Sequence, residues 1–383
     1  MTGPINSKKW LAASALLVLA LLALAGLWHR HAGAQDAAPP PGDVTRYAMI
    51  TDAGPASAQQ IADAAEGLFD ADASGTTQAF ILMRDGKIVA ERYGEGIKPD
   101  TKLLSRSVAK TVTAALIGLM VSDGRLALDS PAPVPAWTQP GDPRGEITLR
   151  NLLQMTSGLE HSEDGPPLYE ADTVRMLFTD GAQDAAAYAE AKPIAAPPGS
   201  RFNYSTADTT ILSDLMTRML TASTEPERRR DAMMEFIRGR LITPVGLSSL
   251  TPEFDARGTM LGGAMLYMTA RDYARFGELL RNNGRVNGHQ LLSARWVEFM
   301  KTPSPHNAGY GGHLWLNHEG AMNPLFPGRG SSRIFAAVGH HGQYLVIDPT
   351  RRLVILRIGV SVDEQYNGVR RALVRLIELF PQG

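Results

Sequence analysis

The two ends of the chain are rich in short strand-like runs, whereas the long middle part is rich in helical patterns. Residues 78–94 hold two β-rich runs on either side of Asp85-Gly86, a dipeptide that strongly favours a two-residue hairpin. After residue 330 the runs "RIFAAVG", "GQYLVIDP" and "RLVILRIGV" are again short, apolar and separated by turn residues. Residues 130–330 are mainly helical in pattern, with long Pro- and Gly-rich loops. This arrangement predicts one sheet built from both chain ends, next to an inserted helical lobe.

Helices are predicted beside the strands at both ends. Residues 57–72 have apolar side chains at helical spacing, and the run "NGVRRALVRLIELF" closes the chain. A third and strongly apolar helix is predicted to begin at Ser107 and to end at Asp123-Gly124.

The N-terminus has the pattern of an export signal or a membrane anchor. Lys8 and Lys9 precede an uncharged run over residues 10–28 that has a Trp at each end. Ala32-Gly33-Ala34 has the small-x-small form of a cleavage site, and the uncharged run is nearly long enough to span a bilayer. We therefore expect export, with the protein either periplasmic or anchored to the membrane through residues 10–28.

Three regions follow from these patterns. We predict a signal peptide or N-terminal anchor over 1–34, a Pro-rich linker over 35–56 and one folded domain over 57–383, with its helical lobe at about 130–330.

Composition excludes several classes of site and partner. The 383-residue chain has a formal net charge of -1, so nothing favours nucleic acid as a partner. It contains no cysteine, which excludes disulfides, a thiol nucleophile and cysteine-ligated metals. Most of the histidines show no metal-ligand spacing, and we predict no metal site from His29, His31, His161, His289, His306, His313 and His318.

Ser107 and Lys110, in "SRSVAKTV", are the candidate nucleophile and base. Positions three apart share a face of a helix, so the lysine amine can reach the serine hydroxyl one turn back. A lysine can take a serine proton only if burial or a nearby cation lowers its pKa, and the apolar neighbours here favour burial. In the first turn the N–H of Ser107 is free to donate to an oxyanion. The alternative is that Ser107 caps the helix while Lys110 extends to solvent.

Tyr204 lies just after a Pro-Gly turn and just before a predicted helix, in "APPGSRFNYSTADTTILSDL". A tyrosine at such a junction can point its hydroxyl into a cleft and relay a proton between nucleophile, lysine and leaving group. The alternative is a partly buried core tyrosine. Tyr169, in the loop "EDGPPLYEAD", could close over a substrate, although loop aromatics more often serve packing.

His340, His341 and Gly342 precede the strand-like run in "AAVGHHGQYLVIDP". Gly342 would let a substrate approach the backbone closely, and the N–H of Gln343 could be a second oxyanion donor. The alternative is a hairpin turn with exposed histidines.

Together these motifs resemble the penicillin-recognising serine hydrolases. The branch concerned holds class C β-lactamases, D-alanyl-D-alanine carboxypeptidases, related esterases and 6-aminohexanoate-dimer (nylon oligomer) hydrolases, and the resemblance covers about residues 57–380. It implies an α+β fold of the β-lactamase/transpeptidase type. In that fold an antiparallel sheet is flanked by terminal helices, and a cleft separates it from an all-helical inserted lobe.

The resemblance also implies roles for individual residues. Ser107 would be the acylated nucleophile, Lys110 its general base and Tyr204 the relay that delivers a proton to the leaving group. The N–H groups of Ser107 and Gln343 would form the oxyanion hole. No metal or organic cofactor is implied.

Two of the expected substrate-binding positions depart from the family pattern. The tyrosine element is usually Tyr-x-Asn, but here Thr206 replaces the amide and offers no amide fork. The late strand usually carries Lys-Thr-Gly, but here it has His340-His341-Gly342, and a neutral imidazole gives a substrate carboxylate no fixed cation.

Both departures favour a small linear amide or ester over an antibiotic or a cell-wall peptide. The leading hypothesis is therefore an exported serine hydrolase whose nearest analogues are the nylon-oligomer hydrolases and related esterases. The alternatives are a carboxypeptidase or β-lactamase acting at the cell wall, and a catalytically silent binding protein on the same scaffold. The sequence leaves the natural substrate and the oligomeric state open.

Overall fold

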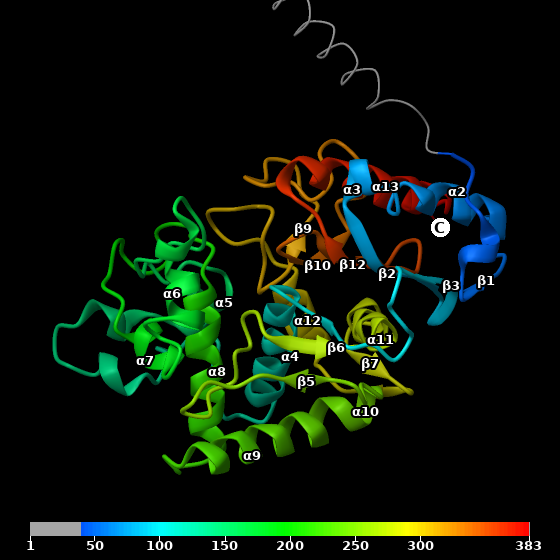
Figure 1. Ribbon diagram of the computed structural model, residues 1–383. Coiled ribbons are helices and arrows are strands. Elements are labelled where there is room, and N and C mark those ends of the chain that lie inside the picture. The colour runs from blue at the N-terminus through cyan, green and yellow to red at the C-terminus, as the bar shows by residue number, and fades with distance from the viewer. Residues whose placement is uncertain (1–39, 383) are drawn as a thin grey trace, which may run out of the picture. The chain divides into compact units, whose positions relative to one another are not determined.

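A seven-stranded antiparallel sheet joins the two ends of the folded part of the chain (Figure 1). The computed structural model describes residues 40–382. In the centre of the sheet a strand from the N-terminal part pairs with one from the C-terminal part, which confirms a sheet built from both ends. The strands, in spatial order, are β1 Met49–Ile50, β3 Lys87–Tyr93, β2 Thr76–Arg84, β12 Leu353–Val360, β11 Gln343–Asp348, β10 Phe335–Gly339 and β9 Trp315–Leu316.

The hairpin between β2 and β3 turns at the two residues that the sequence indicates. Asp85 has φ 51° and Gly86 has φ 76°, so both central residues adopt the left-handed conformation that a type I′ turn requires. The predicted hairpin is confirmed.

Helices cover both faces of the sheet. Along β2, Phe80 and Leu82 belong to one hydrophobic cluster, whereas Ala79 and Ile81 belong to the other, as the two-residue period of a strand requires. The first cluster holds the terminal helices α2 (Ala58–Glu66) and α13 (Tyr366–Glu378), which lie side by side in Figure 1. The second holds α4 (Val108–Ser122) and α11 (Ala270–Arg281).

The folded domain begins earlier than the predicted start at residue 57. Val44–Arg46 form a 3-10 turn and β1 pairs with β3, so the linker predicted over 35–56 ends before these residues. The compact unit starts at Gly42. The predicted signal peptide or anchor over 1–34 lies outside the described residues. Of the helices between residues 40 and 382, none combines the length and apolarity needed to cross a bilayer.

The inserted segment at 130–330 is mainly helical, but it is not all-helical as expected. The short strands β4 (Leu103–Leu104) and β5 (Thr251–Pro252) both pair with β6 (Leu266–Met268), β7 (Arg285–Val286) pairs with β8 (His289–Gln290), and β9 joins the large sheet. Strands of two or three residues are too short to show a sequence period. The remaining elements are α3 Ala71–Ser74, α5 Leu149–Leu153, α6 Asp172–Phe178, α7 Ala185–Glu190, α8 Thr206–Leu220, α9 Pro226–Ile237, α10 Thr243–Val245 and α12 Ala294–Met300.

Helix α4 runs through the middle of the molecule, between the sheet and the lobe. Every residue from Val108 to Met120 is buried, as expected of a helix that is apolar on all sides. It contacts α8 of the lobe and β10 of the sheet. Ser107 is its N-cap, and Gly124 with φ 70° follows its end, which confirms the predicted bounds.

Candidate active site

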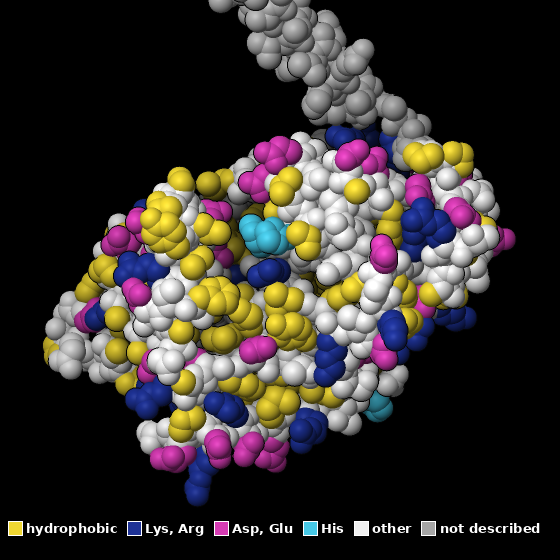
Figure 2. Space-filling view, in the orientation of Figure 1, with side chains coloured by type: hydrophobic (Ala, Val, Ile, Leu, Met, Phe, Trp, Pro, Cys, Tyr) yellow, Lys and Arg dark blue, Asp and Glu magenta, His cyan; other side chains and the backbone are white. Residues whose placement is uncertain are grey.

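A cavity of about 980 Å³ lies at the N-terminal end of α4. It is open to one face of the molecule, where Figure 2 shows histidine side chains beside a hollow bordered by apolar groups. Its walls come from both parts of the fold, and they include Ser107, Glu163, Tyr204, Trp315, His340 and Tyr366.

Ser107 and Lys110 meet at the base of this cavity. The Lys110 Nζ lies 3.1 Å from the Ser107 Oγ, and the lysine side chain is only 1% exposed. The hydroxyl of Ser107 makes no capping bond to the helix. Neither alternative predicted for this pair, a capping serine or a solvent-directed lysine, is present. Lys110 also donates to the Thr206 Oγ1 at 2.7 Å and to the Gly263 carbonyl at 3.0 Å, which fixes its position.

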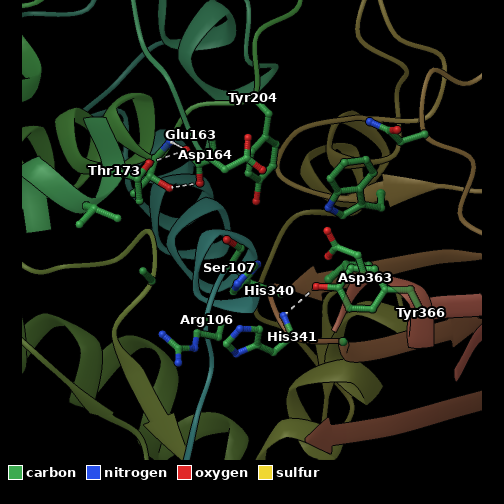
Figure 3. A pocket seen from close by; sticks show the side chains of 18 of the residues that line it. Arg106, Ser107, Glu163, Asp164, Thr173, Tyr204, His340, His341, Asp363 and Tyr366 are labelled. Carbon is green, nitrogen blue, oxygen red and sulfur yellow. Dashed lines mark hydrogen bonds between the residues drawn. The ribbon is translucent and has the colours of Figure 1, made fainter. Parts of the chain in front are cut away.

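Tyr204 points its hydroxyl toward Ser107 from the segment before α8 (Figure 3). Its ring centroid lies 4.8 Å from the Lys110 Nζ, and the ring packs against Tyr310 and Trp315. Burial raises the pKa of Tyr204 above its ordinary value, although Lys110 opposes this effect. The phenol therefore holds its proton at neutral pH. The structure brings Ser107, Lys110 and Tyr204 together as the sequence predicts.

Glu163 is a site residue that the sequence analysis does not identify. Its Oε1 lies 3.7 Å from the Lys110 Nζ and accepts from the Thr206 Oγ1 at 2.5 Å, while its Oε2 accepts from the Thr206 N–H at 2.7 Å. The Thr173 hydroxyl at 2.9 Å and the His161 Nε2 at 3.0 Å complete its contacts.

The Glu163 carboxyl is ionised in this environment. Burial alone would raise its pKa, but the charge of Lys110 and hydrogen bonds from His161 and Thr206 outweigh burial and lower the pKa to about 2. Glu163 follows from no motif, because only the folded chain brings its loop beside Lys110.

Two predicted substrate-binding residues are placed differently from the expectation. Tyr169 is 69% exposed and does not line the cavity, whereas its neighbour Leu168 does. Thr206 does line the cavity, but its hydroxyl is engaged by Lys110 and Glu163. Thr206 therefore positions Lys110 and has no free hydroxyl proton for a substrate.

The His340–Gly342 segment forms the turn between β10 and β11, as in the alternative interpretation, but only His340 is exposed and His341 is half-buried. His340 and His341 do line the cavity, with their ring centroids 4.0 Å apart. Gly342 has φ 78°, and a Cβ there would lie 2.8 Å from the buried Arg357 guanidinium. This glycine thus serves the turn and its packing.

The second predicted oxyanion donor, Gln343, is not at the cavity. It is 3% exposed, lies in β11 opposite Gly339 and does not line the cavity wall. Its side chain is paired with the backbone of Gly359. The expectation for Gln343 is therefore not supported by its position.

The free edge of β10 faces the cavity instead. Strand β9 pairs only with Phe335 and Ala336, and the Ile334 carbonyl accepts from Asn317 on the same side. Because backbone groups alternate along a strand, the N–H group of Val338 points to this edge beyond the end of β9. His340 follows directly, as the first residue of the turn after β10. Both residues line the cavity.

Gly339 brings this edge close to the nucleophile. A Cβ at position 339 would lie 2.8 Å from the Ser105 carbonyl oxygen and 3.0 Å from the Arg106 Cβ. A side chain would therefore push β10 away from the segment that carries Ser107. The glycine needed for a close approach is Gly339 and not Gly342.

No group of three or more His, Asp or Glu side chains within residues 40–382 is arranged to hold a metal ion. The polar groups at the cavity base contact one another directly. Their arrangement suits proton transfer from a hydroxyl to an amine and stabilisation of negative charge by backbone N–H groups.

Comparison with known proteins identifies the family of the chain. The chain matches the family described as Beta-lactamase over residues 62–377. It is 25% identical over 298 residues to the 6-aminohexanoate-dimer hydrolase of Paenarthrobacter ureafaciens. The aligned region covers 75% of this chain and 73% of the relative.

Solved structures share the fold. A Bacillus anthracis protein with a provisional assignment as a 6-aminohexanoate-dimer hydrolase has a TM-score of 0.65 at 24% identity, covering 83% of each chain. EstCE1, a hydrolase with promiscuous acyltransferase activity, has a TM-score of 0.62 at 18% identity, covering 84% of this chain and 98% of its own. Because the family match extends over most of the chain and the fold agrees, this protein belongs to the Beta-lactamase family.

Proposed function

We propose that this protein is a serine hydrolase that cleaves a small ester or amide through an acyl-enzyme on Ser107. The observation that supports this most strongly is the 3.1 Å contact between the Ser107 Oγ and the buried Lys110 Nζ at the base of an open cavity. The family membership supports a hydrolase at the same site.

In the first half-reaction the serine oxygen attacks the substrate carbonyl carbon. Lys110, in its neutral amine form, takes the hydroxyl proton as the C–O bond forms. The N–H groups of Ser107 and His340 donate to the oxyanion, with His340 taking the place first predicted for Gln343. Tyr204 then passes its proton to the leaving oxygen or nitrogen while it receives the proton held by Lys110.

In the second half-reaction water attacks the acyl carbon. The water proton moves to the Tyr204–Lys110 pair, and the Ser107 oxygen departs with a proton from the same pair. Glu163 stabilises the ammonium that Lys110 becomes in each attack, since its carboxylate lies 3.7 Å from that nitrogen.

A small linear ester or amide suits this site better than a cell-wall peptide. Thr206, which replaces the amide of the family pattern, already has its hydroxyl bonded to Glu163. The nylon-oligomer hydrolases, to one of which the chain is similar, offer an analogue for the reaction.

A fluorophosphonate probe tests the nucleophile directly. Wild-type protein should be labelled and should hydrolyse 4-nitrophenyl acetate, whereas Ser107→Ala should do neither. Turnover by Ser107→Ala at the wild-type rate would refute the assignment, and an unlabelled, inactive wild type would favour the silent binding protein. Stoichiometric labelling by fluorescent penicillin would favour the carboxypeptidase or β-lactamase alternative.

We also propose export, on the pattern of residues 1–34 alone. Expression of the full chain with a C-terminal tag, followed by cell fractionation and N-terminal sequencing, tests this proposal. Recovery of the intact chain only in the cytoplasm would contradict it.

A further inference from the structure

Arg106 is a cation in the cavity wall that the proposed reaction does not use. It immediately precedes Ser107, is half-buried and lines the cavity. Within residues 40–382 its guanidinium forms no ion pair, although most other half-buried arginines in this range have a carboxylate partner. A guanidinium in the wall of an open cavity, with no carboxylate partner, is a ready site for an anion.

The backbone of Arg106 is held rigidly. Its φ is 48°, in the left-handed region that a residue with a long side chain rarely occupies. The Ser105 hydroxyl donates to the Arg106 carbonyl at 3.0 Å, and the Ser105 N–H donates to the Leu266 carbonyl at 2.8 Å. Gly339 of β10 packs against the Arg106 Cβ from the other side. The guanidinium therefore projects from a fixed base.

The position of Arg106 indicates which half of a substrate it would meet. In Figure 3 Tyr204 and Arg106 lie on opposite sides of Ser107. Tyr204 delivers the proton to the leaving group, so the leaving group lies on the Tyr204 side of the scissile bond. The acyl part then extends toward Arg106.

The neighbouring charges do not cancel this cation. His340 and His341 lie beside it, with their rings tilted against each other. Burial, together with His340 and Arg106, lowers the pKa of His341 below its ordinary value. Asp363 lies beyond these rings from Arg106 in Figure 3, and Glu163 is engaged by Lys110 and Thr206.

We propose that Arg106 binds a carboxylate at the far end of the acyl part of the substrate, so that the enzyme prefers monoesters or monoamides of dicarboxylic acids. This proposal rests on the proposed function, because it takes the leaving-group side from the role of Tyr204. It places the substrate carboxylate on the acyl side of the scissile bond.

Three esters with six-carbon acyl chains and nitrophenolate leaving groups distinguish a carboxylate on the acyl side of the scissile bond from one on the leaving-group side. They are 4-nitrophenyl hexanoate, which is neutral, the mono-4-nitrophenyl ester of adipic acid, which carries its charge on the acyl chain, and 3-carboxy-4-nitrophenyl hexanoate, which carries it on the leaving group. The quantity compared is the ratio of kcat/KM for each charged ester to that for the neutral one, since a general loss of activity cancels in this ratio.

Wild type should prefer the adipate ester over the hexanoate by about tenfold or more, as expected for a charge-assisted hydrogen bond. Arg106→Gln should abolish this preference, and Arg106→Lys should restore part of it. Arg370→Gln is the matched control, because it removes another arginine of the same cavity, one that contacts the Tyr344 hydroxyl at 3.3 Å. It should change the ratio by less than about threefold.

The outcomes separate the two proposals. Equal rates for adipate and hexanoate in wild type, or an unchanged preference in Arg106→Gln, would overturn the role of Arg106 while Ser107-dependent turnover persists. A preference for the charged leaving group that depends on Arg106 would also overturn it. Failure of the proposed function itself would instead appear as turnover that survives Ser107→Ala.

Discussion

Lys110 shares its surroundings with one ionised carboxylate, that of Glu163, and the other nearby acid is neutral. The Glu163 Oε1 lies 3.7 Å from the Lys110 Nζ, and His161 contacts the second carboxylate oxygen. Burial raises the pKa of Asp208 to about 8, so that this acid is mostly protonated at pH 7. Glu163 is thus the ionised carboxylate in contact with Lys110 within the part of the chain that the structure describes.

Glu163→Gln should lower kcat/KM about tenfold at pH 8. The amide keeps the size of the side chain but removes the carboxylate charge that lies 3.7 Å from the Lys110 Nζ, so the ammonium formed during attack is less stabilised. Rates with 4-nitrophenyl acetate at pH 8 measure this effect.

Asp164→Asn is the matched control, since Asp164 is the next residue, lines the same cavity and is exposed. Its kcat/KM should stay within about threefold of the wild-type value. A wild-type rate in Glu163→Gln would show that the Glu163 charge does not stabilise the attack.

Among the individual site residues, Ser107, Lys110 and Tyr204 could be identified from the sequence, because a helical spacing and a turn-to-helix junction constrain where those side chains point. Glu163 could not be found in the same way. It lies in an irregular loop, and its approach to Lys110 depends on how the lobe packs against α4.

Strand β10 is the element that completes the site, and its register decides which glycine matters. The sequence shows two glycines, Gly339 and Gly342, on either side of the two histidines. Only the pairing of Gly339 with Gln343 reveals that position 339 packs against Ser105 and Arg106 while position 342 lies in the turn. Local patterns cannot distinguish these two, because the register depends on partner strands distant in the sequence.

Gly339→Ala should therefore impair catalysis more than stability. The added Cβ would meet backbone at 2.8 Å and push the β10 edge, with its N–H groups, away from Ser107. A displacement of the oxyanion donors by about 1 Å is expected to lower kcat/KM by about a hundredfold. Kinetics with 4-nitrophenyl acetate, together with the thermal midpoint, test this.

Gly342→Ala is the companion variant, and it should impair stability more than catalysis. Its φ of 78° and its contact with Arg357 predict a loss of about 1–2 kcal/mol in the free energy of unfolding, with a smaller loss of kcat/KM than in Gly339→Ala. Equal effects of the two substitutions on activity would contradict the assignment of the oxyanion edge to β10.

For the whole molecule, the pattern of strands at both ends is sufficient to predict the central sheet and the two terminal helices that cover it. The prediction fails where the strands are shortest. Strands β1 and β9 have two residues each, which is too short for a strand period to appear in the sequence. The sequence therefore predicts neither the early start of the domain at β1 nor the edge strand β9 beside the cavity. Their positions depend on pairing with β3 and β10.

Stability of the whole molecule depends on pH through a buried acid next to the site. Asp208 on α8 is fully buried, and its Oδ1 accepts from the Ser157 hydroxyl at 2.8 Å. No partner within residues 40–382 contacts its Oδ2. Burial raises its pKa to about 8, although hydrogen bonds from Ser157 and Ser205 oppose this.

The direction of this pH dependence follows from the protonation of Asp208 in the unfolded and the folded state. In the unfolded chain the Asp208 carboxyl ionises near pH 4, whereas in the folded protein it keeps its proton until about pH 8. Between these values the unfolded state binds fewer protons, so this residue makes the folded state progressively less stable as the pH rises. Below pH 4 both states are protonated and the effect vanishes.

Asp208→Asn should remove this dependence, because an amide has no proton to lose and its carbonyl can still accept from Ser157. The free energy of unfolding of the variant minus that of wild type should therefore increase from pH 5 to pH 8, by on the order of a few kcal/mol. Urea unfolding followed by circular dichroism at pH 5, 6, 7 and 8 measures this difference. Asp100→Asn, at an exposed position, should give a difference that stays constant with pH. If the difference for Asp208→Asn were equally flat, the carboxyl would be ionised in the folded protein, and Glu163 would not be the sole source of negative charge beside Lys110.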